Sequence, residues 1–412
     1  MEHGSRTEQA PPRALSTRAG RALAGLAGAI AIATAGALAV LWPTEDLGGA
    51  LAGGLAGETE AAEIVAVEVA ACPPPQPGEC GTARAVLESG PDEGETIELQ
   101  VGRTLLDPEL GVGDGIRVTR TEIQPPPTED TGAAPVQPSG PVYSFADFER
   151  RAPMLWLSLA FAALVIALGR LRGALSLVGL VASLGVVVVF IIPAILEGQP
   201  PLAVAVTGAL AVMLLTISLA HGLSVKSLAA ILGTTASLLL VAALAAVFTG
   251  LTHLTGLSSE EATLLQLDGI EVDFQGLLLA GMVIGALGVL DDVTVSQAST
   301  VLALRGANPS FSFGDLYRRA IDVGRDHISA TVNTLVLAYV GASLPVLLVF
   351  SAGTAGLIDT LNVELVSKEV VATLVGSIGL IAAVPITTAL TAAACRALPE
   401  DALRAEAAGH PH

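Results

Sequence analysis

The stretch LAVAVTGALAVMLLTISLA, residues 202–220, contains no charged side chain and is long enough to cross the hydrocarbon of a bilayer as one helix. A second such stretch, LAAILGTTASLLLVAALAAVFTG at 228–250, follows after a short polar turn. Because a backbone in lipid must satisfy its own hydrogen bonds, two apolar runs of this length predict a pair of membrane-spanning helices. The fold class they predict is a polytopic α-helical membrane protein.

The composition of the whole chain agrees with that class. Of its 412 residues, 52% are hydrophobic and only 14% are charged, and the mean hydropathy is +0.68. A water-soluble surface of ordinary charge density could not accommodate so many apolar residues. The net charge of −19 comes largely from acids within 45–149 and in short loops. Nucleic acid is excluded as a partner, because no basic patch is available to neutralise phosphates.

Six more apolar runs complete a set of eight predicted spans, each of roughly 20 mostly apolar residues. The spans lie near 22–42, 153–169, 174–195, 202–220, 228–250, 276–296, 330–350 and 369–393. They form one helix followed by a seven-helix transmembrane domain at 150–395. The tails at 1–21 and 396–412 then lie on the same side of the membrane.

The basic residues predict which side that is. With a cytoplasmic N terminus, 13 of the 20 Lys and Arg residues fall on the inner side, and the short outer loops hold only Lys368. Arg150 and Arg151 go against this rule, although acidic residues stand beside them. The predicted localisation is the bacterial cell membrane, with both termini cytoplasmic and residues 43–149 extracytoplasmic.

The first span has two interpretations. Arg21 followed by an apolar run that ends in Ala37-Leu38-Ala39 resembles a signal peptide with a small-residue cleavage site. The run has about 20 residues, however, whereas the apolar core of a signal peptide usually has about 7–15. The length favours a retained anchor at 22–42, and both interpretations export the residues that follow.

Residues 58–124 have the two-residue period of strands. Apolar and polar residues alternate at 63–69, 96–101 and 115–119. The pattern predicts a small all-β extracytoplasmic domain, an OB-like barrel, followed by a Pro-rich linker at 125–141.

Two cysteines bracket a Pro-rich loop, CPPPQPGEC, within this domain. Outside the cytoplasm, oxidising conditions would permit a disulfide between Cys72 and Cys80. Two free thiols are the alternative, and the third cysteine, Cys395, is expected to be an inert apolar residue near a helix end.

The stretch GMVIGALGVLDDVTVSQAS, residues 281–299, places acids at membrane depth. At 100° per residue, Asp292 shares a stripe with Gly281, Gly285, Gly288 and Ser299, with Ser296 at the edge. We expect this polar stripe to be also the most tightly packed face. A buried acid costs about 2.5–3.5 kcal/mol on insertion scales and usually faces a bundle interior or an aqueous cavity. Asp292 is therefore a candidate functional residue, and Asp291, which points elsewhere, is a second; solvation or a structural ion pair is the alternative.

The run GRDHISATVNT, residues 324–334, brings more polar groups to the start of the seventh span. His327 is of the residue type that changes charge near neutral pH, which suits a proton relay, or it forms a hydrogen bond at a helix end. Asn333 could coordinate a cation or bond across helices. Before this run, Ser312 or Asp315 is expected to cap a short basic amphipathic helix at the inner surface.

The candidate translocation or ion site combines residues of both stretches. Its members are Asp291, Asp292, Ser296, Gln297, Arg325, Asp326, His327, Asn333 and Thr334. Spans two to five, in contrast, are predicted to be an apolar framework.

Enzyme motifs are missing from the sequence. It contains no HExxH helix, no GxSxG elbow and no Walker loop, and its cysteines and histidines lack zinc spacing. An intramembrane aspartyl protease would need two facing carboxylates, which Asp292 and Asp326 could supply, but the usual short motifs of that class are absent. We therefore predict no enzyme activity, no cofactor and no metal site.

The runs GALGVLDDVTVSQAS (285–299), GRDHISATVNTLVLAYVGASLP (324–345) and NVELVSKEVVATLVGSIGLIAAVPITT (362–388) resemble the YibE/F-like family of bacterial multi-pass membrane proteins. The resemblance covers roughly 150–395, and an anchor with a β domain before it fits the family layout. It implies a permease-like architecture and carries no settled activity or catalytic assignment.

Two functional hypotheses follow from the sequence. The first is a membrane permease coupled to protons or cations, with the lipid bilayer, a small ion or solute and a second copy of the chain as partners. The second is a sensor or scaffold whose β domain binds a ligand or an envelope partner.

Overall fold

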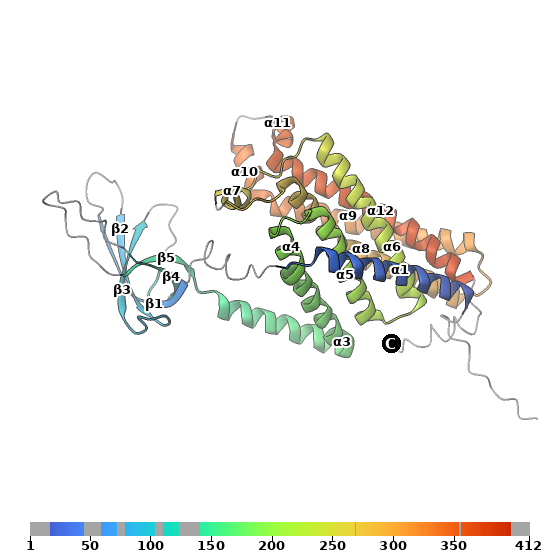
Figure 1. Ribbon diagram of the computed structural model, residues 1–412, viewed down its shortest axis with the longest axis horizontal. Coiled ribbons are helices and arrows are strands. Elements are labelled where there is room, and N and C mark those ends of the chain that lie inside the picture. Colours follow the sequence, from blue (N-terminus) through green and yellow to red (C-terminus); the bar gives the residue numbers. More distant parts are fainter. Residues whose placement is uncertain are drawn as a thin grey trace, which may run out of the picture. The chain divides into compact units, whose positions relative to one another are not determined.

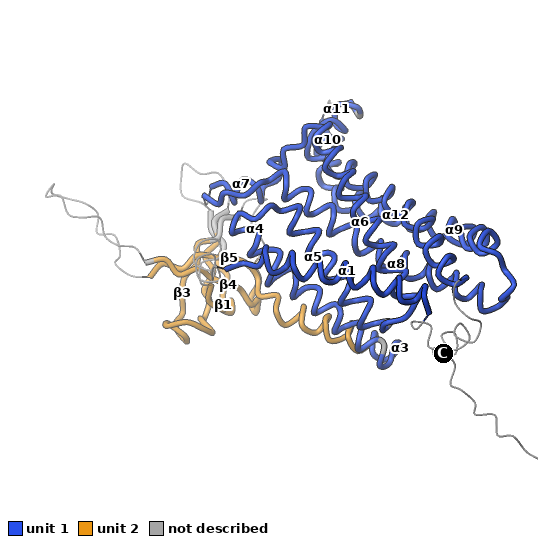
Figure 2. Tube along the Cα trace, turned by 45° about the vertical axis from the view of Figure 1, so that its right-hand side comes forward, with its two compact units in different colours: residues 1–45, 165–412 blue, residues 46–164 orange. Residues whose placement is uncertain are grey.

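The computed structural model describes residues 17–44, 59–71, 79–103, 110–122, 141–267, 269–353 and 356–396. The chain divides into two compact units, 1–45 with 165–412, and 46–164 (Figure 2). Cys72 and the side chain of Cys80, and with them the predicted disulfide, lie outside what the structure describes. The same holds for residues 1–16, 123–140 and 397–412, which make up most of the two predicted tails and of the Pro-rich linker.

A curled five-stranded antiparallel sheet forms the second unit, together with the start of a helix (Figure 1). Its strands are β1 (Thr59–Ala71), β2 (Glu79–Leu87), β3 (Thr96–Arg103), β4 (Gly115–Glu122) and β5 (Pro141–Phe148), in the order β3-β2-β1-β4-β5. The side chains of Ile64, Leu99 and Ile116 alternate onto the inner face, where all three are fully buried.

The three predicted strands are confirmed as parts of β1, β3 and β4. β2 and β5 were not predicted, and β5 lies beyond the predicted end of the domain at 124. β5 begins with Pro141 at the sheet edge, a position where the missing N–H of proline is tolerated.

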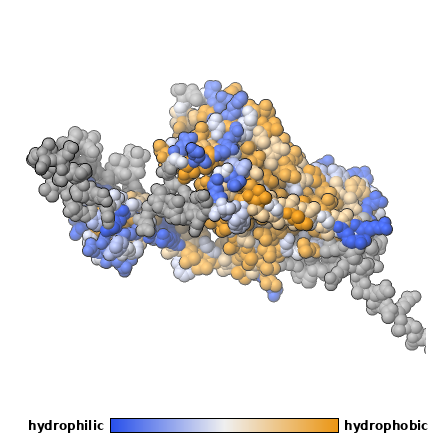
Figure 3. Space-filling model, in the orientation of Figure 1, coloured by the Kyte–Doolittle hydropathy of each residue, from blue (hydrophilic) through white to orange (hydrophobic). Residues whose placement is uncertain are grey.

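The structure is otherwise helical, and its long helices have a broad hydrophobic surface (Figures 1 and 3). They are α1 (Arg18–Leu41), α3 (Arg151–Val186), α5 (Pro201–His221), α6 (Val225–Leu251), α8 (Phe274–Ala307), α9 (Phe313–Ala342) and α12 (Glu364–Arg396). Within the described residues, seven segments are long and apolar enough to cross a membrane, and a bent pair makes an eighth if it is counted as one span.

The second and third predicted spans lie in α3 and the two short helices that follow it. The backbone breaks at Arg170, which has a φ of 51°, and the spans are Arg151–Leu171 and Gly173–Leu196. A side chain at Gly173 would collide with the carbonyl of Val165, so the break needs glycine there. The second of these spans ends in a π-helical turn, η2 (Val187–Ile191), and α4 (Ile192–Leu196).

Two predictions about the seventh span are corrected. The amphipathic segment after Ser312 is not a separate short helix, because α9 continues without a break from Phe313 to Ala342. Its capping box of Ser312 and Asp315 is confirmed. The predicted span 330–350 is bent by 61° between α9 and α10 (Leu344–Ala352). Pro345 explains the bend, since a proline cannot continue the preceding helix without a clash.

Helices α6, α8 and α12 pack against one another at the centre of the first unit, with α5 and α9 against α8 (Figure 1). Small residues allow the close approach. A side chain at Gly233 of α6 would overlap Thr387 of α12, and one at Gly379 of α12 would overlap Val241 of α6.

Candidate functional site

Polar side chains from four of these helices form one layer inside the bundle. The members of this polar layer are Thr216 of α5, Thr234 of α6, Asp291, Thr294 and Gln297 of α8, and Thr387 and Thr388 of α12. Helix α9 contributes the backbone carbonyl of Ala320.

Asp291 is the acidic member of the layer. It is partly buried, and its Oδ2 accepts a hydrogen bond from the Thr216 hydroxyl at 3.2 Å. Its Oδ1 is buried and has no hydrogen-bond partner in the described part of the chain. An ionised carboxylate is costly to bury with one oxygen unpaired. The side chain is therefore suited to take up a proton or to contact a cation at Oδ1.

Two hydroxyl groups link the backbone of Asp291 to α6. The hydroxyl of Thr294 donates to the backbone carbonyl of Asp291 at 3.1 Å, and it lies 2.6 Å from the hydroxyl of Thr234. Both threonines are fully buried. These two hydroxyls therefore join α8 to α6 beside the backbone of Asp291, while the carboxylate contacts Thr216 of α5.

Gln297 connects three helices. Its Nε2 donates to the carbonyl of Ala320 in α9 at 2.8 Å and to the hydroxyl of Thr388 in α12 at 2.7 Å. The Gln297 amide packs against Gly324 of α9. If Gly324 had a side chain, its Cβ would lie 3.0 Å from Oε1 of Gln297. The side-chain N–H groups of Gln297 therefore donate to partners within the protein, and the residue holds α8, α9 and α12 together.

The buried hydroxyls of α6, which is the fifth predicted span, correct the expectation that spans two to five are an apolar framework, and α12, the eighth span, adds further buried hydroxyls. Ser237 and Thr387 are fully buried, and their hydroxyls, like that of Ser377, have no hydrogen-bond partner in the described residues. In α12 the sequence places three hydroxyl residues within about one helical turn, at Thr387, Thr388 and Thr391. They were not predicted to form a polar layer, because hydroxyl residues lower the mean hydropathy of an apolar run only slightly.

The glycine stripe of α8 is a second correction. Gly281, Gly285 and Gly288 share a face with Asp292 and Ser296, as predicted, but that face is exposed. A side chain at Gly281 or Gly288 would meet nothing within 4 Å, whereas one at Gly285 would lie 3.2 Å from the Tyr339 hydroxyl. Helical periodicity tells which residues share a face, and it does not tell what covers that face.

The polar residues of α9 are mostly on its exposed side. Arg325 forms an ion pair with Asp322 at 3.0 Å rather than with Asp291, Asp292 or Asp326. Asp326, Asn333 and Thr334 are exposed, and the Thr334 hydroxyl donates to the carbonyl of Ala330. His327 is partly buried, and its Nε2 has no partner among the described residues. Of the predicted site residues, the structure brings Asp291 and Gln297 into the polar layer.

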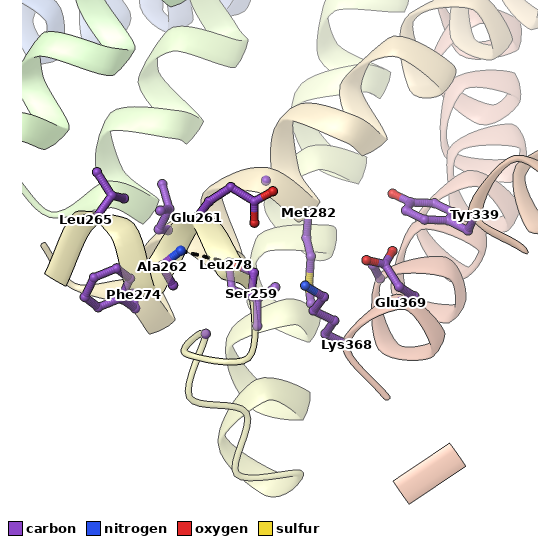
Figure 4. Close-up of a pocket in the computed structure, with 14 residues that line it drawn as sticks. Ser259, Glu261, Ala262, Leu265, Phe274, Leu278, Met282, Tyr339, Lys368 and Glu369 are labelled. Carbon is purple, nitrogen blue, oxygen red and sulfur yellow. Dashed lines mark hydrogen bonds between the residues drawn. The ribbon is translucent and has the colours of Figure 1, made fainter. Parts of the chain in front are cut away.

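A pocket of about 290 Å³ lies where α8, α9 and α12 meet the short helix α7 (Glu260–Leu267) (Figure 4). Its lining is apolar apart from a few groups, among them Glu261, Tyr339, Lys368 and Glu369. A backbone N–H, the Ser259 hydroxyl and the charge of Lys368 lower the pKa of Glu261. The pocket therefore carries fixed charges of both signs.

No group of three or more His, Cys, Asp or Glu residues within the described ranges could hold a metal ion. Comparison with known proteins finds one family: the model for YibE/F-like proteins matches residues 157–397, which include the whole polar layer. No curated protein and no solved structure matches the chain.

Proposed function

The chain belongs to the YibE/F-like protein family, and we propose that it is a membrane permease coupled to protons or small cations. The observation that carries the proposal is the unpaired, buried Oδ1 of Asp291, in a carboxylate whose other oxygen accepts a hydrogen bond from Thr216. An acid inside a bundle of apolar helices is expensive to keep unless it has a function such as ion binding or proton relay.

The proposal places the apolar helices in the bacterial cell membrane, with both termini in the cytoplasm. The excess of basic residues in the inner loops supports this orientation. The curled five-stranded sheet, which we propose to be an OB-like barrel, then lies outside the cytoplasm.

Asp291 has a suitable depth for such a role. It follows Phe274, the first residue of α8, by 17 positions, which is about 25 Å at about 1.5 Å per residue. Since the hydrocarbon core is about 30 Å thick, the acid lies in the inner part of the membrane, far from the outer end of α8. Because Oδ1 itself is buried, a proton or cation that reaches it would have left bulk water, and the Thr216 hydroxyl would hold the carboxylate in place.

The test is flux in proteoliposomes that contain the purified full chain and a pH-sensitive dye. After a pH jump, we expect Asp291→Asn to lose most of the protein-dependent proton flux, because the amide cannot bind a proton at the same position. Asp292→Asn is the matched control: its side chain is exposed, and flux should be largely kept. Wild-type flux in the Asp291→Asn variant would refute the role of this acid.

A sensor or scaffold is the second candidate, and the β domain contains the observation that favours it. Glu60 of β1 is only 9% exposed, and its Oε2 has no hydrogen-bond partner in the described residues. A ligand with a cationic group could satisfy that oxygen. Deleting residues 59–148 distinguishes the two candidates: a receptor would lose its function entirely, whereas a permease should keep part of its flux.

A further inference from the structure

We propose that the pocket where α7, α8, α9 and α12 meet binds a small zwitterion with an apolar body, which is the chemistry of an apolar amino acid. The pocket is distinct from the Asp291 carboxylate. Gly281, which lines the pocket, precedes Asp291 by 10 positions in α8, about 15 Å at about 1.5 Å per residue. The proposal rests on the pocket alone and is independent of the transport function.

The pocket has an apolar side and a polar side (Figure 4). Leu265 and Phe274 lie at one side, and Tyr339, Lys368 and Glu369 lie at the other. A ligand that carries its polar groups at one end and an apolar body at the other matches both sides at once. The volume of about 290 Å³ is at the lower end of the range for ligand sites, so the pocket suits a molecule of amino-acid size.

The polar groups of the pocket are available to a ligand. Lys368 and Glu369 are partly buried, and neither side chain forms a hydrogen bond or an ion pair within the described part of the chain. The hydroxyl of Tyr339 makes no hydrogen bond there either. A partly buried charge has lost some of its water, so a ligand group of opposite charge stabilises it.

Charges of both signs select a zwitterion. The ammonium of Lys368 can pair with a carboxylate, while the carboxylate of Glu369 and the hydroxyl of Tyr339 can accept hydrogen bonds from an ammonium group. A ligand with a carboxylate alone would be repelled by Glu261 and Glu369. A ligand with an ammonium alone would leave Lys368 without a partner. An α-amino acid carries both charges on one carbon and satisfies both sets of groups.

Hydrogen bonds fix the loop that forms one wall of the pocket. Glu364, the first residue of α12, accepts from the backbone N–H of Thr255 at 2.8 Å and of Gly256 at 2.7 Å. The side-chain amide of Gln275 in α8 donates to the carbonyl of Leu254 at 2.7 Å. These bonds hold the loop before α7 against α8 and α12. The wall is therefore preorganised, and binding need not order it.

Equilibrium binding of radiolabelled L-leucine to the purified full chain in detergent tests the ligand class. We expect saturable binding. Two analogues each lack one charge of leucine: 3-methylbutylamine lacks the carboxylate, and 4-methylpentanoate lacks the ammonium. Each should compete about tenfold less well than unlabelled leucine, because each loses one charge-assisted contact. The absence of saturable leucine binding, or an amine that competes as well as leucine, would overturn the proposal.

Substitutions of two glycines in α8 locate the site. A side chain at Gly281 would begin in open space within the pocket, so Gly281→Leu should fill the pocket and weaken leucine binding at least about tenfold. Gly288→Leu is the matched control, because a Cβ there would also meet nothing within 4 Å and Gly288 does not line this pocket. Leucine binding should be kept in this variant. Wild-type binding in Gly281→Leu, or equal loss in both variants, would contradict the location.

Lys368→Met tests the pairing with the ligand carboxylate. We expect leucine to bind about tenfold more weakly, whereas the affinity for 3-methylbutylamine, measured by calorimetry, should not fall. Equal losses for the two ligands would contradict the pairing. This variant keeps Gly281, so it still decides if Gly281→Leu fails to fold. Leucine binding in detergent that is lost in nanodiscs of phosphatidylethanolamine would identify a lipid head group as the occupant and overturn the proposal.

Discussion

Asp291 and Asp292 are neighbours in the sequence with different surroundings. A helix turns by about 100° per residue, so one side chain meets Thr216 of α5 while the other is exposed. Together they provide an internal control for any experiment on α8. The same rotation explains why Gln297 is buried among three helices while Ser296 beside it is exposed.

Gln297 is predicted to stabilise the bundle rather than to bind the transported species. Replacing it by Leu removes its hydrogen bonds to α9 and α12, and we expect a loss of about 1–2 kcal/mol in the free energy of unfolding. Unfolding of the full chain in mixed detergent micelles measures this loss. Ser296→Ala, next to it, should change the free energy very little. A Gln297→Leu protein as stable as the wild type would contradict the positioning role.

Tyr143 of the β domain is predicted to titrate at unusually high pH. Burial, followed by the 2.5 Å hydrogen bond from its hydroxyl to Asp92, raises the pKa of Tyr143 to about 12. Because the folded-state pKa is raised, the stabilisation is fully present below the unfolded-state pKa of about 10 and is lost as the pH rises from 10 to 12.

The phenolate absorbance of the full chain measures this titration, since only three tyrosines contribute. Tyr143→Phe should remove the step near pH 12. The variant should also be less stable than the wild type below pH 10, with the difference shrinking at higher pH. A Tyr143 step at the usual pH of about 10 would show that the bond to Asp92 does not form.

At the scale of elements, the contact between α6 and α12 depends on glycines at two points. We expect Gly233→Ala to cost about 1–3 kcal/mol in the free energy of unfolding, because the new methyl group would overlap Thr387 across the contact. Gly288→Ala in α8 is the matched control. Its methyl group would meet nothing within 4 Å, and alanine favours a helix by about 1 kcal/mol over glycine. Destabilisation of both variants to the same extent would argue against close packing at Gly233.

The elements also show where sequence patterns are sufficient. Long apolar runs predict α5 and α6 to within a few residues, since length and hydropathy alone decide whether a helix can cross a bilayer. The break between α9 and α10 is decided locally by Pro345, and a hydropathy average passes over it. β2 was not predicted because the alternation of apolar and polar residues along it is a weak signal. The pairing of β2 with β1 and β3, which defines this strand, is visible only in the structure.

At the scale of the whole molecule, the orientation of the chain is the main prediction to test. In intact cells that carry a cysteine-free variant of the protein, we expect Glu63→Cys in β1 to react with a membrane-impermeant maleimide. Ser310→Cys, between α8 and α9, should react only after the membrane is permeabilised. Both residues are exposed, so accessibility within the protein does not limit either reaction. The reverse pattern would invert the orientation.

The sequence by itself determined the fold class, the positions of the apolar helices and the presence of a β domain, because these depend on composition and short-range periodicity. Only the tertiary structure decided which polar residues meet. It joined Asp291 to Thr216 and Gln297 to Thr388, which are far apart in the chain, and it left Asp326, Asn333 and the glycine stripe of α8 exposed. The physical reason is that hydrogen bonding and burial depend on which helices lie side by side, and hydropathy along one chain does not contain that information.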